Sequence, residues 1–506
     1  MLRGFIILDF GSQYTQIIAR RLRDIGFYSE IVPHDMSMDQ IKQKNPYGLI
    51  LSGGPQSVYD QNSLSRDVKA LLEVAPLMGI CYGFQLIIHQ LGGKIEPANH
   101  REYGKQMVRW KKPFRGVSLN QSVWMSHGDV ATKIPEQLKV IAESENHPAV
   151  IQGEKILGVQ FHPEVFHTDQ GEELFLEFAE MCAAKKTWNS GSMLVEAENF
   201  VKTQVGASEK VLCALSGGVD STVVATLLHK ILKPGQLQCL FVDTGLLRDQ
   251  EAQEVMKAYE TLGLPVIKAD ARKLFLEQLS GVSDPEKKRK LIGKLFIDTF
   301  DSEVKKLKQN FTWLAQGTLY PDVIESVSLH GSSVTIKSHH NVGGLPEKMN
   351  LKVLEPVRFL FKDEVRNLGQ SLGLPESFIQ RHPFPGPGLA IRILGEISES
   401  KIQILQKADR IYIDFLKEKN LYHKIWQAFC VLLPVQTVGV QGDSRTYDNA
   451  LVLRAVTSRD GMTADWYEFE MKDLKEVSSR ITNQVKGINR VVYDVTSKPP
   501  ATIEWE

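Results

Sequence analysis

The sequence has few cysteines, and their spacing does not suggest a metal site. Five cysteines are scattered over 506 residues, and none of them form a Cys-x-x-Cys pair. The spacing argues against a zinc ribbon, and the odd, sparse count argues against a disulfide framework. Such cysteine usage is typical of a reducing compartment.

The sequence also lacks an excess of one charge and a long apolar run. Lys plus Arg and Asp plus Glu both number 60, so the formal net charge is +0. General nucleic-acid binders usually carry a basic excess, so we expect no nucleic-acid partner. No stretch approaches the roughly 18 apolar residues of a membrane helix. The N-terminal "MLRGFIILDFG" is interrupted by Asp9 and lacks the cleavage site of a signal peptide. We therefore expect a cytoplasmic protein without a membrane partner.

The order of apolar and polar segments predicts three domains. In the first third, short apolar strands alternate with helical patterns, which favours a parallel sheet covered by helices. This rhythm ends before the polar stretch Thr187 to Ser192 and restarts at Val211. A Pro- and Gly-rich stretch, Arg381 to Arg392, precedes a mixture of helices and β-branched strands. We predict two parallel-sheet α/β domains and a small α+β domain, with boundaries at 1–187, 193–381 and 382–506.

A third absence concerns the stretch "KVLCALSGGVDSTVVATLL" from Lys210 to Leu228. A strand, a glycine turn and a helix follow one another as in a phosphate-binding loop, but the lysine of a Walker loop is missing. The turn still offers free backbone N–H groups and hydroxyls to an anion, and Asp220 is placed to lie near a bound cation. The alternative is an ordinary strand-to-helix turn. The expected nucleotide-binding residues are Ser216, Gly217, Gly218, Val219, Asp220, Ser221 and Thr222.

A second candidate site centres on a cysteine between two glycines. "GICYG" places Cys81 between Gly79 and Gly83, after an apolar strand and before a helix. This pattern is typical of a nucleophile elbow, where the helix N-terminus favours a thiolate. In "FHPE", His162 and Glu164 are two apart on an extended chain and point the same way. They can serve as base and orienter for the cysteine. The alternatives are a buried structural cysteine and a core histidine.

A glycine pair after another strand completes this site. In "LILSGGPQSV", Gly53 and Gly54 leave backbone N–H groups free that could stabilise an oxyanion. Together, "LSGGP", "GICYG" and "FHPE" resemble the class I glutamine amidotransferases. That resemblance implies glutamine hydrolysis through a thioester, with Cys81 as nucleophile, His162 as base and Glu164 as orienter.

The lysine-free loop has its own resemblance. "SGGVDST" resembles the loop of the N-type ATP pyrophosphatases, which have the adenine nucleotide α-hydrolase fold. The resemblance implies that ATP is a substrate, that it is cleaved between its α and β phosphates, and that Mg²⁺ accompanies it. An oxygen that receives AMP becomes a leaving group for ammonia, so the two sites together predict an ATP- and glutamine-dependent amination.

Five later stretches resemble the GMP synthases: "QGTLYPDVIES", "KSHHNVGGLP", "RHPFPGPGLA", "GVQGDSRTYDNA" and "SKPPATIEWE". This resemblance implies that xanthosine 5′-monophosphate is aminated to GMP, with AMP, pyrophosphate and glutamate as the other products. It also implies a homodimer formed through the last domain, which helps to complete the xanthylate site. The implied xanthylate-binding residues are Arg289, Gln441, Lys498, Ile503 and Glu504.

Two other functions are compatible with parts of the sequence. The pyrophosphatase loop also occurs in tRNA-modifying enzymes, which would need a basic face and an RNA-binding appendage. A non-enzymatic regulator built on inactive domains is the other alternative. The zero net charge argues against the first, and the intact loop and cysteine motifs argue against the second.

Overall fold

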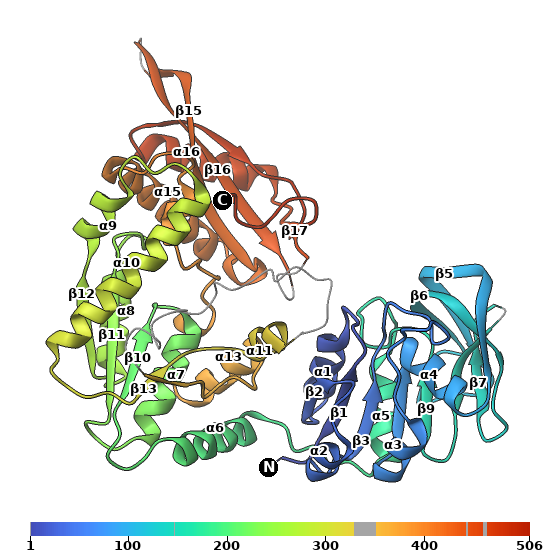
Figure 1. The fold of residues 1–506 in the computed structure, drawn as a ribbon. Helices are drawn as coiled ribbons and strands as arrows, with labels where there is room; N and C mark the ends of the chain where they lie inside the picture. The colour runs from blue at the N-terminus through green and yellow to red at the C-terminus, as the bar shows by residue number, and fades with distance from the viewer. Residues whose placement is uncertain (1, 146, 328–350, 442–443, 459–462) are drawn as a thin grey trace. The chain divides into compact units, whose positions relative to one another are not determined.

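The computed structural model describes residues 2–145, 147–327, 351–441, 444–458 and 463–506. The chain forms two compact units, Met1–Met193 and Leu194–Glu506 (Figure 1). The helix α6 (Ser190–Gln204) lies where the chain passes from one unit to the next.

A mixed sheet forms the centre of the first unit. Among the described residues, its strands pair in the order β2-β1-β3-β4-β9-β8-β7-β5-β6. The first five strands in this order run parallel, as in the flavodoxin-like doubly wound folds. They are β1 (Phe5–Asp9), β2 (Ser29–Pro33), β3 (Gly48–Leu51), β4 (Leu77–Ile80) and β9 (Ile156–Val159).

The central strands are apolar throughout because helices cover both faces of a parallel sheet. Every residue of "GLIL", "LMGI" and "ILGV" in β3, β4 and β9 is buried. The helices of this unit are α1 (Thr15–Asp24), α2 (Met38–Gln43), α3 (Val68–Val74), α4 (Tyr82–Gln90) and α5 (Glu172–Met181).

An antiparallel extension that the sequence analysis did not predict widens this sheet. It consists of β5 (Lys94–Trp110), β6 (Asn120–Lys133), β7 (Lys139–Glu143) and β8 (Pro148–Gln152). The pairs β5–β6, β5–β7 and β7–β8 are antiparallel, and β8 joins the extension to β9. Burial along β6 does not alternate regularly, so its sequence carries only a weak period-two signal.

The second unit begins with an all-parallel sheet, as predicted. Its strand order within the described residues is β12-β11-β10-β13-β14, so the direction of winding reverses beside β10. Ligands bind at such a switch point, outside the carboxyl ends of the strands. The strands are β10 (Val211–Leu215), β11 (Leu237–Asp243), β12 (Val266–Asp270), β13 (Trp313–Ala315) and β14 (Lys352–Leu354). The helices are α7 (Val219–Ile231), α8 (Glu251–Thr261), α9 (Arg272–Leu279), α10 (Pro285–Lys306), α11 (Tyr320–Val327), α13 (Lys362–Ser371) and α14 (Glu376–Ile379).

The last part of this unit mixes helices with a second sheet. Its helices are η1 (Gly388–Arg392), α15 (Glu399–Glu418), η2 (Tyr422–Lys424) and α16 (Met471–Gln484). Its strands are β15 (Gln427–Gln441), β16 (Ser444–Thr457), β17 (Asp465–Trp466) and β18 (Ile488–Tyr493). One hydrophobic core contains both Leu212 of β10 and Leu453 of β16. The boundary near residue 382 therefore stays a prediction.

The Pro- and Gly-rich segment from Arg381 to Arg392 is fixed against the parallel sheet. Nη1 of Arg381 donates to the main-chain oxygen of Gly217 at 2.9 Å. The N–H of Leu389 donates to the oxygen of Leu246, just after β11, at 2.8 Å. Gly388 has a φ of 64°, and a Cβ there would overlap that same oxygen. This close approach explains why glycine occupies the position.

His382 anchors the other side of this segment. Its Nδ1 accepts from the N–H of Ala428 at 3.1 Å, and its Nε2 lies 2.9 Å from the main-chain oxygen of Tyr422. These partners select the neutral ring with its proton on Nε2. Burial lowers the pKa of His382 to about 4.

Because of His382, we expect the free energy of unfolding to decrease as the pH decreases below 7. Its folded-state pKa lies below the ordinary value of 6.5, so the unfolded chain binds the proton first as the pH falls. From pH 7 to pH 5 the loss is about 2 kcal/mol, at roughly 1.4 kcal/mol per unit of pKa. Urea unfolding of the wild type and His382→Gln at both pH values measures it. Equal pH dependence in the two proteins would contradict the assignment.

Candidate active sites

Cys81 lies on the turn between β4 and α4. Its backbone has φ 52° and ψ −102°, and a positive φ is uncommon for a residue with a side chain. A Cβ added to Gly79 would lie 2.6 Å from the main-chain carbon of Gly83, and a Cβ on Gly83 would overlap the oxygen of Leu51. The two glycines therefore permit a turn that presents the cysteine at the start of a helix.

His162 and Glu164 follow β9, the strand next to β4. Nδ1 of His162 lies 2.7 Å from Oε1 of Glu164, and the residues are 3% and 0% exposed. Burial lowers the pKa of His162, but the charges of Glu164 and Cys81 outweigh burial and hold it well above its ordinary value. The carboxylate therefore fixes the ring with a proton on Nδ1 and stabilises its charged form.

One glutamine that the sequence analysis missed lies beside the sulfur, and a second one contacts the first. Nε2 of Gln160 is 4.0 Å from Sγ of Cys81. Oε1 of Gln160 in turn accepts from Nε2 of Gln85 at 3.3 Å, and both glutamines are buried. Gln85 is one turn along α4 from Cys81, and Gln160 is two residues before His162. Their closeness in the sequence to the two motifs was the signal that could have identified them.

Gly53 and Gly54 come together with these residues because of the strand order. They follow β3, and β3, β4 and β9 are parallel neighbours whose carboxyl ends meet at one edge. A Cβ on Gly53 would lie 3.4 Å from Cε1 of His162. A Cβ on Gly54 would lie 3.2 Å from Cγ of Tyr82, the residue after Cys81. The glycine turn thus borders both the imidazole and the nucleophile turn.

The lysine-free loop forms a second site at the switch point after β10. Gly217 has a φ of 81°, and Gly218 is the N-cap of α7, whose first residue is Val219. Oγ of Ser221 lies 3.2 Å from Oγ of Ser216, and the Thr222 hydroxyl donates to the oxygen of Gly218 at 2.8 Å. The N–H groups of the first helical turn are therefore available to an anion.

A lysine reaches this loop from a distant part of the chain. Nζ of Lys362, the first residue of α13, lies 2.7 Å from Oδ2 of Asp220. The helices α7 and α13 pack closely, since a Cβ on Gly369 would lie 2.8 Å from Cγ2 of Val223. The residues 220 and 362 are 142 positions apart, and no local pattern in the sequence connects them.

The basic run at the start of α10 divides into buried and exposed members. Nζ of Lys288 is fully buried and donates to the main-chain oxygens of Ala390 and Ile393 and to Oε2 of Glu506. Burial lowers the pKa of Lys288, although Glu506 opposes the shift. Arg289 lies on the exposed side of α10, where Nη2 donates to the main-chain oxygen of Glu506. Of these two cations, Arg289 is the one that faces solvent.

The other expected xanthylate-binding residues lie in the C-terminal segment or at the end of β15. Oε1 of Glu504 accepts from Nη2 of Arg392 and from Nε2 of Gln427, both at 2.8 Å. Ile503 is buried at 8% exposure, and the N–H of Lys498 donates to the oxygen of Ala464 at 2.7 Å. Gln441 ends β15, but its side chain lies outside the described residues.

Three family models match successive parts of the chain. Glutamine amidotransferase class-I matches residues 6–181, NAD synthase matches residues 193–291, and GMP synthase C terminal domain matches residues 414–505. The first two matches contain the cysteine site and the lysine-free loop, respectively.

Full-length relatives agree with these matches. The chain is 61% identical over 507 residues to GMP synthase [glutamine-hydrolyzing] of Bdellovibrio bacteriovorus, covering 100% of both chains. It is 53% identical to the Aquifex aeolicus protein of the same name, covering 100% of this chain and 99% of that one. The chain belongs to the GMP synthase family.

As a GMP synthase, the chain is a carbon–nitrogen ligase that takes nitrogen from glutamine and uses ATP to convert xanthosine monophosphate to GMP. This membership sets aside the tRNA-modifying enzyme and the inactive regulator. It also accounts for the order of the domains, since the first matched region is a glutamine amidotransferase domain and the next is an ATP-using domain.

The resemblance of the loop to the ATP pyrophosphatases implies Mg²⁺, and the loop offers one oxygen that could hold it. Within the described part of the chain, no group of three or more His, Cys, Asp or Glu residues could hold a metal ion. Oδ1 of Asp220 is buried and has no hydrogen-bond partner among the described residues. Mg²⁺ commonly takes one or two carboxylates and completes its shell with phosphate and water oxygens, so Asp220 fits that role.

Within the described part of the chain, no helix of this GMP synthase has both the length and the apolar character needed to span a membrane.

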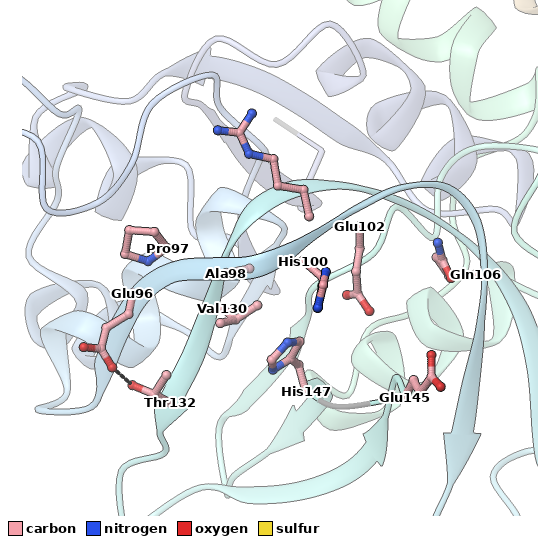
Figure 2. A pocket seen from close by; sticks show the side chains of 11 residues that line it. Glu96, Pro97, Ala98, His100, Glu102, Gln106, Val130, Thr132, Glu145 and His147 are labelled. Carbon is pink, nitrogen blue, oxygen red and sulfur yellow. Dashed lines mark hydrogen bonds between the residues drawn. The ribbon is translucent and has the colours of Figure 1, made fainter.

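A pocket of about 910 Å³ opens beside β5 and β6, away from the residues assigned above. Figure 2 shows carboxylates and imidazoles around it, including Glu102, His100 and His147. Oε2 of Glu102 lies 3.0 Å from Nε2 of His127 on β6. The carbonyl oxygen of Ser126, the residue before His127, lies 3.7 Å from Sγ of Cys81. None of Cys81, His162 and Glu164 lines the pocket.

Proposed function

We propose that Cys81, His162 and Glu164 release ammonia from glutamine. Sγ of Cys81 attacks the side-chain amide carbon, and the N–H groups at Gly53 and Gly54 stabilise the oxyanion. His162 delivers a proton to the leaving ammonia, and Glu164 holds the ring in the required orientation. Water then hydrolyses the thioester to glutamate. The observation that supports this proposal is the meeting of the three motifs at the carboxyl ends of β3, β4 and β9.

The loop after β10 holds the pyrophosphate part of ATP in this proposal. N–H groups of the loop and the hydroxyls of Ser216 and Ser221 bind the β and γ phosphates, and the Thr222 hydroxyl fixes the turn through Gly218. Lys362 adds the positive charge that a Walker loop would carry itself. Mg²⁺ held by Asp220 would neutralise phosphate charge. The xanthine oxygen attacks the α phosphate, pyrophosphate departs, and ammonia then displaces AMP.

The xanthylate site is proposed at the C-terminal segment. Arg289 and Lys498 supply cations for the nucleotide phosphate, Glu504 and Gln441 hydrogen-bond the sugar or base, and Ile503 packs against them. The contact of Arg289 with Glu506 supports this grouping, because it places α10 beside the segment that carries Glu504.

Labelled xanthosine monophosphate tests the order of these steps. With ¹⁸O at the xanthine 2-position, the label is expected in AMP, because that oxygen attacks the α phosphate and leaves with it. Mass spectrometry of AMP and pyrophosphate reads the outcome, with each substrate omitted in turn as the control. Label in pyrophosphate would show that the attack occurs elsewhere on ATP and would overturn the adenylation step.

We also propose the boundaries 1–187, 193–381 and 382–506, a cytoplasmic location and a homodimer formed through the last domain. The long hairpin of β15 and β16 supports the dimer (Figure 1). Val438 pairs with Tyr447 in its register, and Val440 shares their face of the hairpin. These three side chains are 53%, 62% and 74% exposed, an apolar strip that a second copy would cover.

Val438→Lys is expected to weaken the dimer at least about tenfold, since a charge in an apolar interface costs more than 1.4 kcal/mol. Sedimentation equilibrium measures the dissociation constant. Met471→Lys is the matched control, because Met471 is 79% exposed at the start of α16. If both variants dimerise like the wild type, the hairpin is not the interface.

A further inference from the structure

Asp129 lies within β6, three residues after Ser126, and contacts three parts of the glutaminase site. Its carboxylate accepts from the hydroxyl of Tyr59 at 2.7 Å and from Oγ of Ser57. Its main-chain oxygen accepts from Nε2 of Gln85 at 3.1 Å and lies 3.0 Å from Nδ1 of His127. Four side chains therefore converge on one residue.

The carboxylate fixes the loop that follows the glycine pair. Ser57 and Tyr59 are four and six residues after Gly53 in the same irregular segment, and Tyr59 is 44% exposed. Val58 anchors the segment in the hydrophobic core, and the N–H of Ser57 donates to Oδ2 of Asp60 at 3.1 Å. The two hydrogen bonds to Asp129 add the link from this segment to β6. The glycine N–H groups are effective only if they point at the oxygen that becomes negative.

The main-chain oxygen of Asp129 connects the same residue to the nucleophile. Gln85, which donates to it, also contacts Gln160, whose Nε2 is 4.0 Å from Sγ of Cys81. Ser126, three residues before Asp129, directs its carbonyl oxygen at Sγ from 3.7 Å. Asp129 thus links the loop of the oxyanion donors to the helix and strand that hold the sulfur.

We propose that Asp129 is a positioning residue that sets the glycine N–H groups against the carbonyl attacked by Cys81. It contacts no reacting atom and acts through Ser57 and Tyr59. The proposal rests on the proposed glutamine hydrolysis at Cys81. The proposal predicts that loss of the Asp129 carboxylate destabilises the transition state for acyl transfer and leaves the reactivity of Sγ of Cys81 unchanged.

Asp129→Asn tests the proposal with three measurements on the full chain. The kcat for glutamine hydrolysis is expected to fall about 10- to 100-fold, the range for a misplaced catalytic group, while KM for glutamine stays nearly constant because the oxyanion exists only in the transition state. Alkylation of Cys81 by iodoacetamide needs no oxyanion and keeps its wild-type rate. Ammonia-driven GMP formation also keeps its rate.

Single-donor variants sharpen the result. Tyr59→Phe and Ser57→Ala each remove one hydrogen bond and lower kcat in the wild type, but neither lowers it further in Asp129→Asn, because coupled residues are not additive. Asp67→Asn is the matched control, since Asp67 is the N-cap of α3 and Asn caps equally well.

Two results would overturn the proposal. One is an unchanged kcat in Asp129→Asn, and the other is a parallel loss of Cys81 alkylation, which would indicate a general structural role. If Cys81→Ala instead retains glutamine hydrolysis, the proposed nucleophile is wrong, and that failure is separate from this one.

Discussion

Cys81→Ala is expected to abolish glutamine-driven GMP formation and to leave ammonia-driven formation within about twofold of the wild type. Loss of a covalent nucleophile commonly costs 10⁴-fold or more in kcat. Alanine retains the Cβ and therefore tolerates the φ of 52° no worse than cysteine does. The ATP-dependent site needs ammonia as its nitrogen source, and ammonia can be supplied from solution instead of from glutamine. GMP formation with glutamine or with an ammonium salt measures both halves.

Cys182→Ala is the control for the loss of a thiol in the same unit. Burial raises the pKa of the Cys182 thiol to about 12, so it is not ionised at neutral pH and both activities should persist. Failure of ammonia-driven synthesis in folded Cys81→Ala would show that the two sites do not divide the work as proposed. Persistent glutamine-driven synthesis would mean that another group is the nucleophile.

The cysteine site could be predicted because its motifs are local. A strand, a glycine turn and a helix around Cys81 are contiguous in the chain. The need for Gly79 arises within a few residues, from Gly83 and Ile87, whereas the need for Gly83 arises from Leu51 on the neighbouring strand β3. The meeting of His162 with Cys81 needed only parallel strands whose ends share one edge. The antiparallel extension was missed because β5 pairs with β6 through irregular registers that leave no clean alternation.

The basic run of α10 shows what helical periodicity could have added. Lys288 lies on the face of Ile292, Leu295 and Thr299, all of which are buried, at spacings of four, seven and eleven residues. That periodicity predicts that Lys288 is turned inward and that Arg289 is not. Lys362 offers no comparable signal, since its contact with Asp220 depends on the packing of α13 against α7.

Lys362→Met is expected to lower GMP formation about 10²- to 10³-fold with either nitrogen source, the range for removing one electrostatic stabiliser from a transition state. Nζ of Lys362 lies 2.7 Å from Asp220 at the N-terminus of α7. In the proposed mechanism the lysine supplies positive charge beside the departing pyrophosphate, at a loop that carries no cation of its own. Lys362→Arg should recover only part of the rate, because a planar guanidinium does not reproduce a compact ammonium.

The control for this prediction is Lys305→Met, which removes a lysine paired with Asp301 on the surface of α10 at 2.9 Å. The Lys305 side chain is exposed, so the ion pair should contribute little to stability and nothing to the reaction. Steady-state assays with glutamine and with ammonia separate the outcomes. A loss confined to glutamine would place Lys362 in communication with the glutaminase instead of at the phosphates. An unchanged rate would mean that the N–H groups of the loop and the metal stabilise pyrophosphate without a lysine, so that the missing Walker residue is not replaced at all.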